Sequence, residues 1–94
     1  RQILYYVTFR VKRELEPGQT LCVQGSIPAL GNWKKFVHHM KKVDGNTWES
    51  ISPLVTYSFY FQYKYSLLTN NRSEVIDWER GVDRLADLEL MPDI

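Results

Sequence analysis

The fold is decided by the stretch SFYFQYKYSLL, which covers residues 58–68. Large apolar side chains occupy every second position of this stretch: Phe59, Phe61, Tyr63, Tyr65 and Leu67. The positions between them carry Tyr60, Gln62, Lys64 and Ser66. A repeat of two places the two sets on opposite faces of a β-strand, whereas a helix repeats about every 3.6 residues. We therefore predict a half-buried strand over Ser58–Leu68.

Shorter segments on both sides of this stretch show the same repeat. The expected strands cover Tyr5–Lys12, Thr20–Gln24, Trp48–Leu54, Glu74–Glu79 and Leu85–Leu90. They are separated by the turn residues Pro17-Gly18, Gly25-Ser26, Asp44-Gly45 and Arg80-Gly81. Ile27–Trp33 is expected to be a loop, and Lys34–Val43 fits either a short helical turn or an irregular strand. Six to eight short strands predict an all-β protein, an antiparallel β-sandwich.

Length and charge limit the domain organisation and the kinds of partner that the protein can have. The 94 residues support a single domain, residues 1–94. The net charge of +1, without a basic run, argues against nucleic acid or an acidic membrane surface as the main partner. The apolar runs are far shorter than a membrane span. Because the chain starts at Arg1, we expect a module excised from a longer protein and covalently linked to another domain.

Residues typical of catalytic and metal sites are scattered. No Gly-x-Ser-x-Gly elbow occurs, and Cys22 lies within an apolar strand, where a buried inert thiol is expected. His38 and His39 are adjacent, so on a strand they face opposite sides and do not share a metal. Asp77 and Glu79 share a strand face and are interpreted as solvated charges. We predict no catalytic residue, no metal site and no cofactor.

The single cysteine also gives an indication of the cellular compartment. One cysteine excludes an internal disulfide framework. The sequence itself does not indicate the cellular location of the protein. A single free cysteine fits the cytoplasm better than secretion.

Two of the three tryptophans stand in polar surroundings. Trp33 follows Leu30-Gly31-Asn32, and Trp78 lies between Asp77 and Glu79, just before a turn. Each could lie half-buried as a lid on the sandwich, or serve as an exposed platform on which a flat ligand stacks. Trp48, in contrast, is expected to belong to the core.

Lys64 and Gln62 favour the platform interpretation. They project from the strand face opposite Tyr63 and Tyr65, and a lysine in an aromatic strand must reach water or a partner. Aromatic rings beside amide, ammonium and carboxylate groups suit a sugar, whose apolar face stacks while its hydroxyls form hydrogen bonds. Stacked nucleobases would need a positively charged track as well. A different alternative is protein–protein contact, with the tryptophans as hot spots.

The run VQGSIPALGNW, residues 23–33, resembles the signature V-x-G-S-x-x-x-L-G-x-W of the family 20 carbohydrate-binding modules, the starch-binding domains. Later segments agree in order: Trp48, then FQYKY at residues 61–65, then Trp78-Glu79, then Asp83-Arg84. The resemblance spans about Val7 to Leu90. It implies an open antiparallel β-sandwich with an immunoglobulin-like arrangement and about seven to eight strands. It also implies non-catalytic binding of α-1,4-linked glucan, that is starch, amylopectin or glycogen, and their maltooligosaccharides and cyclodextrins.

The resemblance also implies which residues bind. Trp33 and Trp78 match the two stacking tryptophans, and Lys64 matches the lysine that bonds sugar hydroxyls. Gln62 stands where the family has an acidic residue, and Asp83 stands where it has asparagine, so both keep an acceptor. The implied role is to hold an attached catalytic or regulatory domain on the polymer.

The second site of many family members has no counterpart in this sequence. Its two tyrosines correspond to Pro17 and to the loop of residues 44–47, which contains no tyrosine. We therefore predict that this site is absent or much altered. Tyr57 and Tyr60 are further aromatic residues to which the sequence assigns no role.

Overall fold

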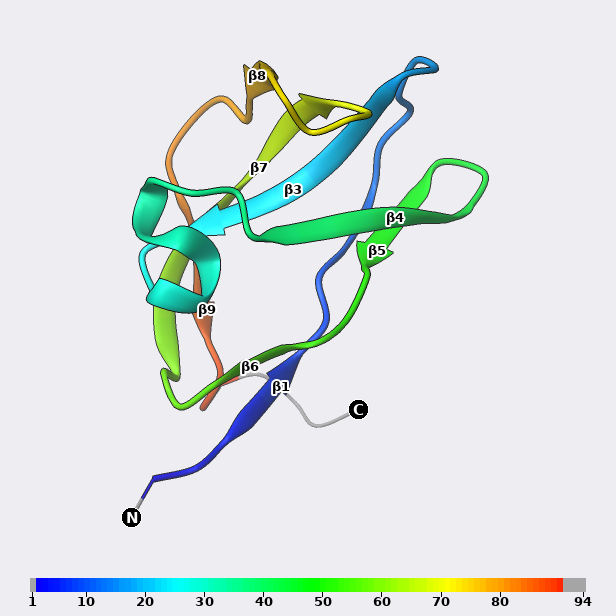
Figure 1. Ribbon diagram of the computed structural model, residues 1–94. Coiled ribbons are helices and arrows are strands. Elements are labelled where there is room, and N and C mark those ends of the chain that lie inside the picture. The colour runs from blue at the N-terminus through cyan, green and yellow to red at the C-terminus, as the bar shows by residue number, and fades with distance from the viewer. Residues whose placement is uncertain (1, 91–94) are drawn as a thin grey trace.

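The computed structural model describes residues 2–90. Residue 1 and residues 91–94, the ends of the predicted domain, lie outside the described part. Nine strands and one short 3₁₀-helix follow each other along the chain (Figure 1). They are β1 (Tyr5–Val7), β2 (Arg10–Lys12), β3 (Gln19–Gly25), η1 (Pro28–Trp33), β4 (His38–Asp44), β5 (Thr47–Ser50), β6 (Leu54–Thr56), β7 (Tyr60–Thr69), β8 (Val75–Trp78) and β9 (Arg84–Asp87). The all-β prediction is confirmed.

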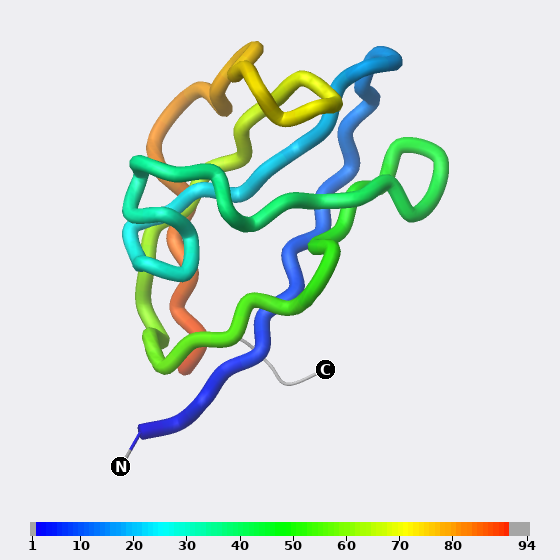
Figure 2. The backbone as a smooth tube through the Cα atoms, viewed as in Figure 1, coloured from blue at the N-terminus to red at the C-terminus, as the bar shows by residue number. Residues whose placement is uncertain are grey.

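The strands form two antiparallel sheets that curl into a sandwich-like fold. The larger sheet has the order β2-β5-β4-β3-β7-β8, and β9 pairs with the first half of β7. The smaller sheet consists of β1 and β6. Figure 2 shows the β4–β5 turn projecting away from the rest of the chain, on the side opposite η1. The strand β7 is the centre of the larger sheet, since it pairs with β3, β8 and β9.

The two faces of β7 differ as its sequence predicts. Phe61, Tyr65 and Leu67 are buried in the core, together with Leu21 and Val23 of the neighbouring strand β3. Tyr60 and Gln62 lie on the opposite face and are exposed. Phe59, which the alternation placed with the core residues, precedes β7 and is exposed, because the strand begins only at Tyr60.

We call the second face the outer face of β7. It carries Tyr60, Gln62, Lys64 and Ser66, with their cross-strand neighbours Asp87, Leu85, Gln24 and Trp78. Antiparallel pairing puts directly opposed side chains on the same face of the sheet. These eight residues therefore lie on one face of the sheet, although they come from four strands. Gln24 and Ser66 are buried there, each 1% exposed.

Two predicted strands are split in the structure, so there are nine strands rather than seven or eight. The Tyr5–Lys12 segment changes partner near Phe9: β1 pairs with β6, and β2 pairs with β5. The Trp48–Leu54 segment is interrupted before Leu54, because Pro53 has no N–H to donate to a sheet. The ambiguous Lys34–Val43 segment is a loop followed by β4.

The predicted loop Ile27–Trp33 is largely a 3₁₀-helix that packs mainly against β3, while the two residues before this loop contact β7. At Gly25 an added Cβ atom would lie 2.6 Å from the carbonyl oxygen of Gln62, so only glycine allows this approach. Ser26 then bonds the Gln62 backbone twice, through its own N–H and its hydroxyl, each at 3.0 Å. Buried Leu30 anchors η1 in the core. Gly31, Asn32 and Trp33 all have positive φ, which ends the helix with Trp33 turned to the surface.

Candidate functional site

Lys64 is the polar centre of the outer face of β7. Its side chain is 19% exposed, and its Nζ donates to the carbonyl oxygen of Gly81 at 2.6 Å. Nζ also lies 3.6 Å from Oδ1 of Asp83. The structure therefore brings together Lys64 and Asp83, two of the residues that the resemblance assigns to the binding site. An ammonium group has three N–H donors, so Lys64 keeps donor capacity for a ligand hydroxyl.

The loop that carries Gly81 and Asp83 is fixed by Glu79. The Glu79 N–H donates to the Tyr65 carbonyl at 3.0 Å, and its Oε1 accepts from the Tyr65 N–H at 3.2 Å. Its Oε2 accepts from Nε of Arg84 at 2.7 Å, and this hydrogen bond raises the pKa of Arg84. Glu79 was interpreted as a solvated charge; it is instead a structural clamp, because its carboxylate bonds both the sheet and the far end of the loop.

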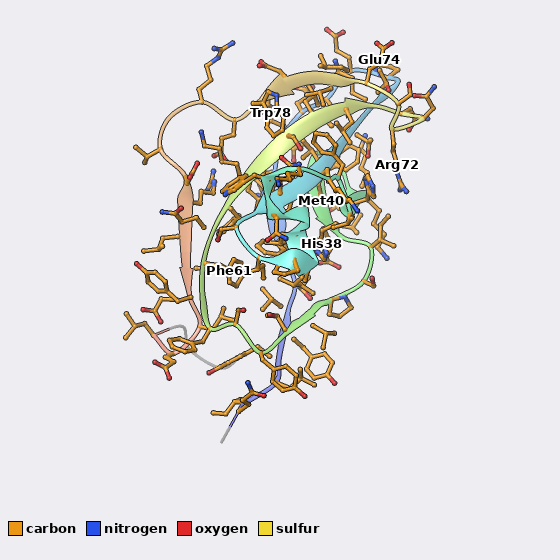
Figure 3. The ribbon with its side chains drawn as sticks, turned by 60° about the vertical axis from the view of Figure 1, so that its left-hand side comes forward. His38, Met40, Phe61, Arg72, Glu74 and Trp78 are labelled. Carbon is orange, nitrogen blue, oxygen red and sulfur yellow. The ribbon has the colours of Figure 1, made fainter. Side chains whose placement is uncertain are left out.

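Trp78 is the last residue of β8 and 43% exposed. It lies opposite Ser66, at the end of the row that Lys64 continues. The centre of its indole is 5.5 Å from the ring of Phe36, with 39° between the planes. Figure 3 places Trp78 at one end of β8, and Arg72 and Glu74 at the turn before its other end. Phe36 therefore supports one side of the indole while the rest stays accessible.

Trp33 ends η1 and is 36% exposed. The chain reaches Phe36 three residues later, so the short segment 33–36 links the two tryptophans. The buried amide of Gln24 holds this segment by donating its Nε2–H to the Lys35 carbonyl at 2.8 Å. Among the aromatic pairs of residues 2–90, the two indoles do not stack on each other. They are separate surfaces, Trp33 at the start of this segment and Trp78 against Phe36 at its end.

Gln62 completes the predicted set. It lies on the outer face of β7, two positions from Lys64, and its side chain is exposed. The backbone of Gln62 is engaged by Ser26, whereas its carboxamide makes no hydrogen bond within the described part of the chain. The amide therefore offers one acceptor and two donors to a ligand.

The contacts that fix this surface were not predicted from the sequence. Phe36 lies in the segment whose structure was ambiguous, and Gln24 occupies the variable position of the Val23–Trp33 motif. One signal was available for Gln24, because a polar residue between the apolar residues of a central strand needs a hydrogen-bond partner. For Phe36 no local signal exists, since its partner Trp78 is distant in sequence.

The third tryptophan is a core residue, as predicted. Trp48 is buried, and its Nε1–H donates to the Arg13 carbonyl at 3.1 Å. A pocket of about 360 Å³ lies beside it, between the two loops where a second site was predicted to be lost. Its walls include Arg13, Glu14, Lys42 and Asn46 but no tyrosine.

The remaining reactive side chains serve the fold. Nε2 of His38 lies 2.9 Å from the Ser50 hydroxyl, whereas Nε2 of His39 lies 3.1 Å from the Phe36 carbonyl, so the two rings have different partners. Cys22 is fully buried, and burial raises the pKa of its thiol to about 11. Within residues 2–90 no group of three or more potential metal ligands occurs. No helix there has the length and hydrophobicity of a membrane span.

Comparisons with known proteins identify the family of the chain. The family model "Starch binding domain" matches residues 4–90. Among solved structures, a glycoside hydrolase family 15 glucoamylase from Hypocrea jecorina has a TM-score of 0.77 and 25% sequence identity. The match covers 90% of this chain but only 14% of the glucoamylase chain. The comparison with curated proteins found no match. Because the family model covers nearly the whole sequence, the chain belongs to the starch-binding domain family, whose members are non-catalytic modules that bind starch-type α-glucans.

Proposed function

We propose that the domain binds α-1,4-glucan on a surface formed by Trp33, Trp78 and Lys64, with Gln62 and Asp83 as additional hydrogen-bonding groups. The observation that carries the proposal is the placement of Lys64. Its ammonium group is held beside Asp83, on the same strand face as the exposed indole of Trp78. An apolar ring next to fixed donors and acceptors is what one face and the rim of a pyranose require.

Each residue has a defined role in this proposal. The indoles of Trp33 and Trp78 stack on the C–H faces of two glucose units. Lys64 donates to a hydroxyl, and Asp83 accepts from one. Gln62 supplies both functions where a family member would carry an acidic residue, so this site has less negative charge.

The exposed areas of the tryptophans set the scale of the affinity. The exposed fractions of 36% and 43%, applied to a side chain of roughly 250 Å², leave about 100 Å² per indole. Covering that area is worth roughly 2.5 kcal/mol per platform at about 25 cal/mol/Å². Ordering the ligand offsets part of the gain, so we expect dissociation constants between about millimolar and micromolar.

Affinity in this range suits a module that tethers an attached domain. A polymer offers many equivalent sites, and an attached domain gains effective concentration at its surface. The glucoamylase with the matching fold is a much longer chain than this one. We propose that this chain is likewise one unit of a longer protein and holds a catalytic or regulatory domain on starch or glycogen. Maltooligosaccharides and cyclodextrins are the short ligands with which binding can be measured.

Calorimetry with maltoheptaose tests the assignment. Trp33→Ala and Trp78→Ala should each weaken binding at least about tenfold, because each removes one platform. Tyr6→Ala is the matched control, since Tyr6 is an exposed aromatic residue of β1 outside the site. Unchanged binding in both tryptophan variants would remove these residues from the site. Capture of a protein that depends on Trp33, without glucan binding by the wild type, would favour a protein-interaction role.

A further inference from the structure

We infer that the glucan surface continues along β7 to Tyr60, which provides a further stacking position used only by longer glucan chains. The inference rests on the proposed function, because it extends the site around Lys64. The relevant observation is the placement of Tyr60 on the outer face of β7, in line with Gln62 and Lys64.

The geometry of the strand determines the distance between Tyr60 and Lys64. Side chains on one strand face recur every second residue, so Tyr60 lies about 14 Å from Lys64 along the strand. This distance exceeds the width of one sugar ring. A short ligand centred on Lys64 and Trp78 therefore leaves Tyr60 uncovered, whereas a longer chain that follows β7 reaches it.

The ring of Tyr60 is available for stacking. Its side chain is 57% exposed, although it lies within a regular strand. Among the aromatic pairs of residues 2–90, none includes Tyr60. Tyrosine also combines an apolar ring with a hydroxyl at its tip, which suits a ligand that is apolar on one face and polar at its rim.

The neighbours of Tyr60 continue the chemistry of the site. Leu85 lies opposite Gln62 and is exposed, which adds an apolar surface beside Gln62. Asp87 lies directly opposite Tyr60. The carboxylate of Asp87 accepts one N–H, that of Glu89 at 3.2 Å, and a carboxylate can accept several more. Beside Lys64, the outer face of β7 thus combines the apolar side chains of Leu85 and Tyr60 with the hydrogen-bonding groups of Gln62 and Asp87.

Chain-length dependence distinguishes this position from the rest of the site. The wild-type domain and its variants are titrated by calorimetry with β-cyclodextrin and with a long linear maltooligosaccharide. Tyr60→Ala should weaken binding of the long ligand about fivefold or more, because one stacking contact is lost. Binding of β-cyclodextrin should stay unchanged. Tyr60→Phe keeps the ring and should retain most of the affinity for the long ligand.

Controls separate this inference from the proposed function. Tyr57→Ala removes a comparably exposed tyrosine that precedes β7 and should change neither titration. Tyr60→Thr repeats the test with a residue that favours strands, in case alanine perturbs the fold. If both Tyr60→Ala and Tyr60→Thr bind the long ligand as the wild type does, the extension to Tyr60 is refuted while the proposed site stands. If the wild type binds neither ligand, the proposed function fails and the extension fails with it.

Discussion

Replacing Phe36 with alanine is expected to weaken glucan binding without removing any group that touches the sugar in our account. Phe36 packs against Trp78, with 5.5 Å between the ring centres, and holds the indole from one side. Without this support the indole gains rotational freedom that binding must remove again. Immobilising one side chain costs roughly 0.5–1.5 kcal/mol, which corresponds to a loss of about two- to tenfold in affinity.

The stability of the domain should change as well. An aromatic pair of this kind contributes about 0.5–1.5 kcal/mol beyond the area it buries. Phe36→Ala should therefore lower the free energy of unfolding by at least this amount, measured by chemical denaturation. Val37→Ala is the matched control, because Val37 is the exposed neighbour of Phe36 and has no aromatic ring to pack against Trp78.

A double-mutant cycle decides whether Phe36 acts through Trp78. Calorimetric titrations with β-cyclodextrin are made on the wild type, on each single variant and on Phe36→Ala/Trp78→Ala. Once the indole is absent, the change at position 36 should have no further effect on the dissociation constant. An equal loss in the presence and absence of Trp78 would show that Phe36 contacts the ligand itself. An unchanged dissociation constant in Phe36→Ala would refute the supporting role.

Two buried side chains give further predictions. Burial, with a smaller contribution from His39, lowers the pKa of His38, so the unfolded chain binds more protons than the folded chain below about pH 6.5. The free energy of unfolding should be highest above that pH and fall on acidification, by at most about 1.4 kcal/mol per pH unit for this group, until the folded-state pKa is passed. Chemical denaturation between about pH 7.5 and pH 5.5 checks this, and an equal dependence in His38→Gln would contradict it. Cys22, fully buried and with a thiol pKa raised to about 11, should react with a thiol reagent only after denaturation; rapid labelling of the native domain would show that the strand opens.

The alternation of apolar and polar residues along β7 gave most of the structural predictions. Because a strand repeats every two residues, the stretch Ser58–Leu68 predicted both the core residues and the outer face on which Gln62 and Lys64 lie. The failure at Phe59 has a simple reason. Alternation shows which face a residue would take within a strand but not where the strand begins, and β7 begins one residue later.

The resemblance to the starch-binding domains supplied what alternation could not. It named Trp33 and Trp78 as members of one site, although they belong to segments far apart in the sequence. The structure adds the contacts that fix this site: Phe36 against Trp78, and Glu79 between Tyr65 and Arg84. Such contacts depend on how loops fold back over the sheet, and the sequence of a loop carries no repeat from which this can be predicted.

Split strands show the same limit at the edges of the sheets. Pro53 predicts that the strand is interrupted, because proline has no N–H to donate to a neighbouring strand. The sequence does not show that a new strand, β6, begins directly after it. The Tyr5–Lys12 segment keeps its alternation across the break near Phe9, because Tyr5, Val7 and Phe9 still face inward. The change of pairing partner from β6 to β5 therefore cannot be predicted from the alternation of apolar and polar residues.

The most direct test of the central claim is a titration of the intact domain with β-cyclodextrin, followed by tryptophan fluorescence. Two of the three tryptophans are exposed in the proposed site, and Trp48 is buried outside it. We predict a saturable change in emission with a dissociation constant between about millimolar and micromolar. We also predict that Trp33→Ala and Trp78→Ala each shift the curve to higher ligand concentration. No saturable change in the wild type, or a curve that neither substitution shifts, would contradict glucan binding at this surface.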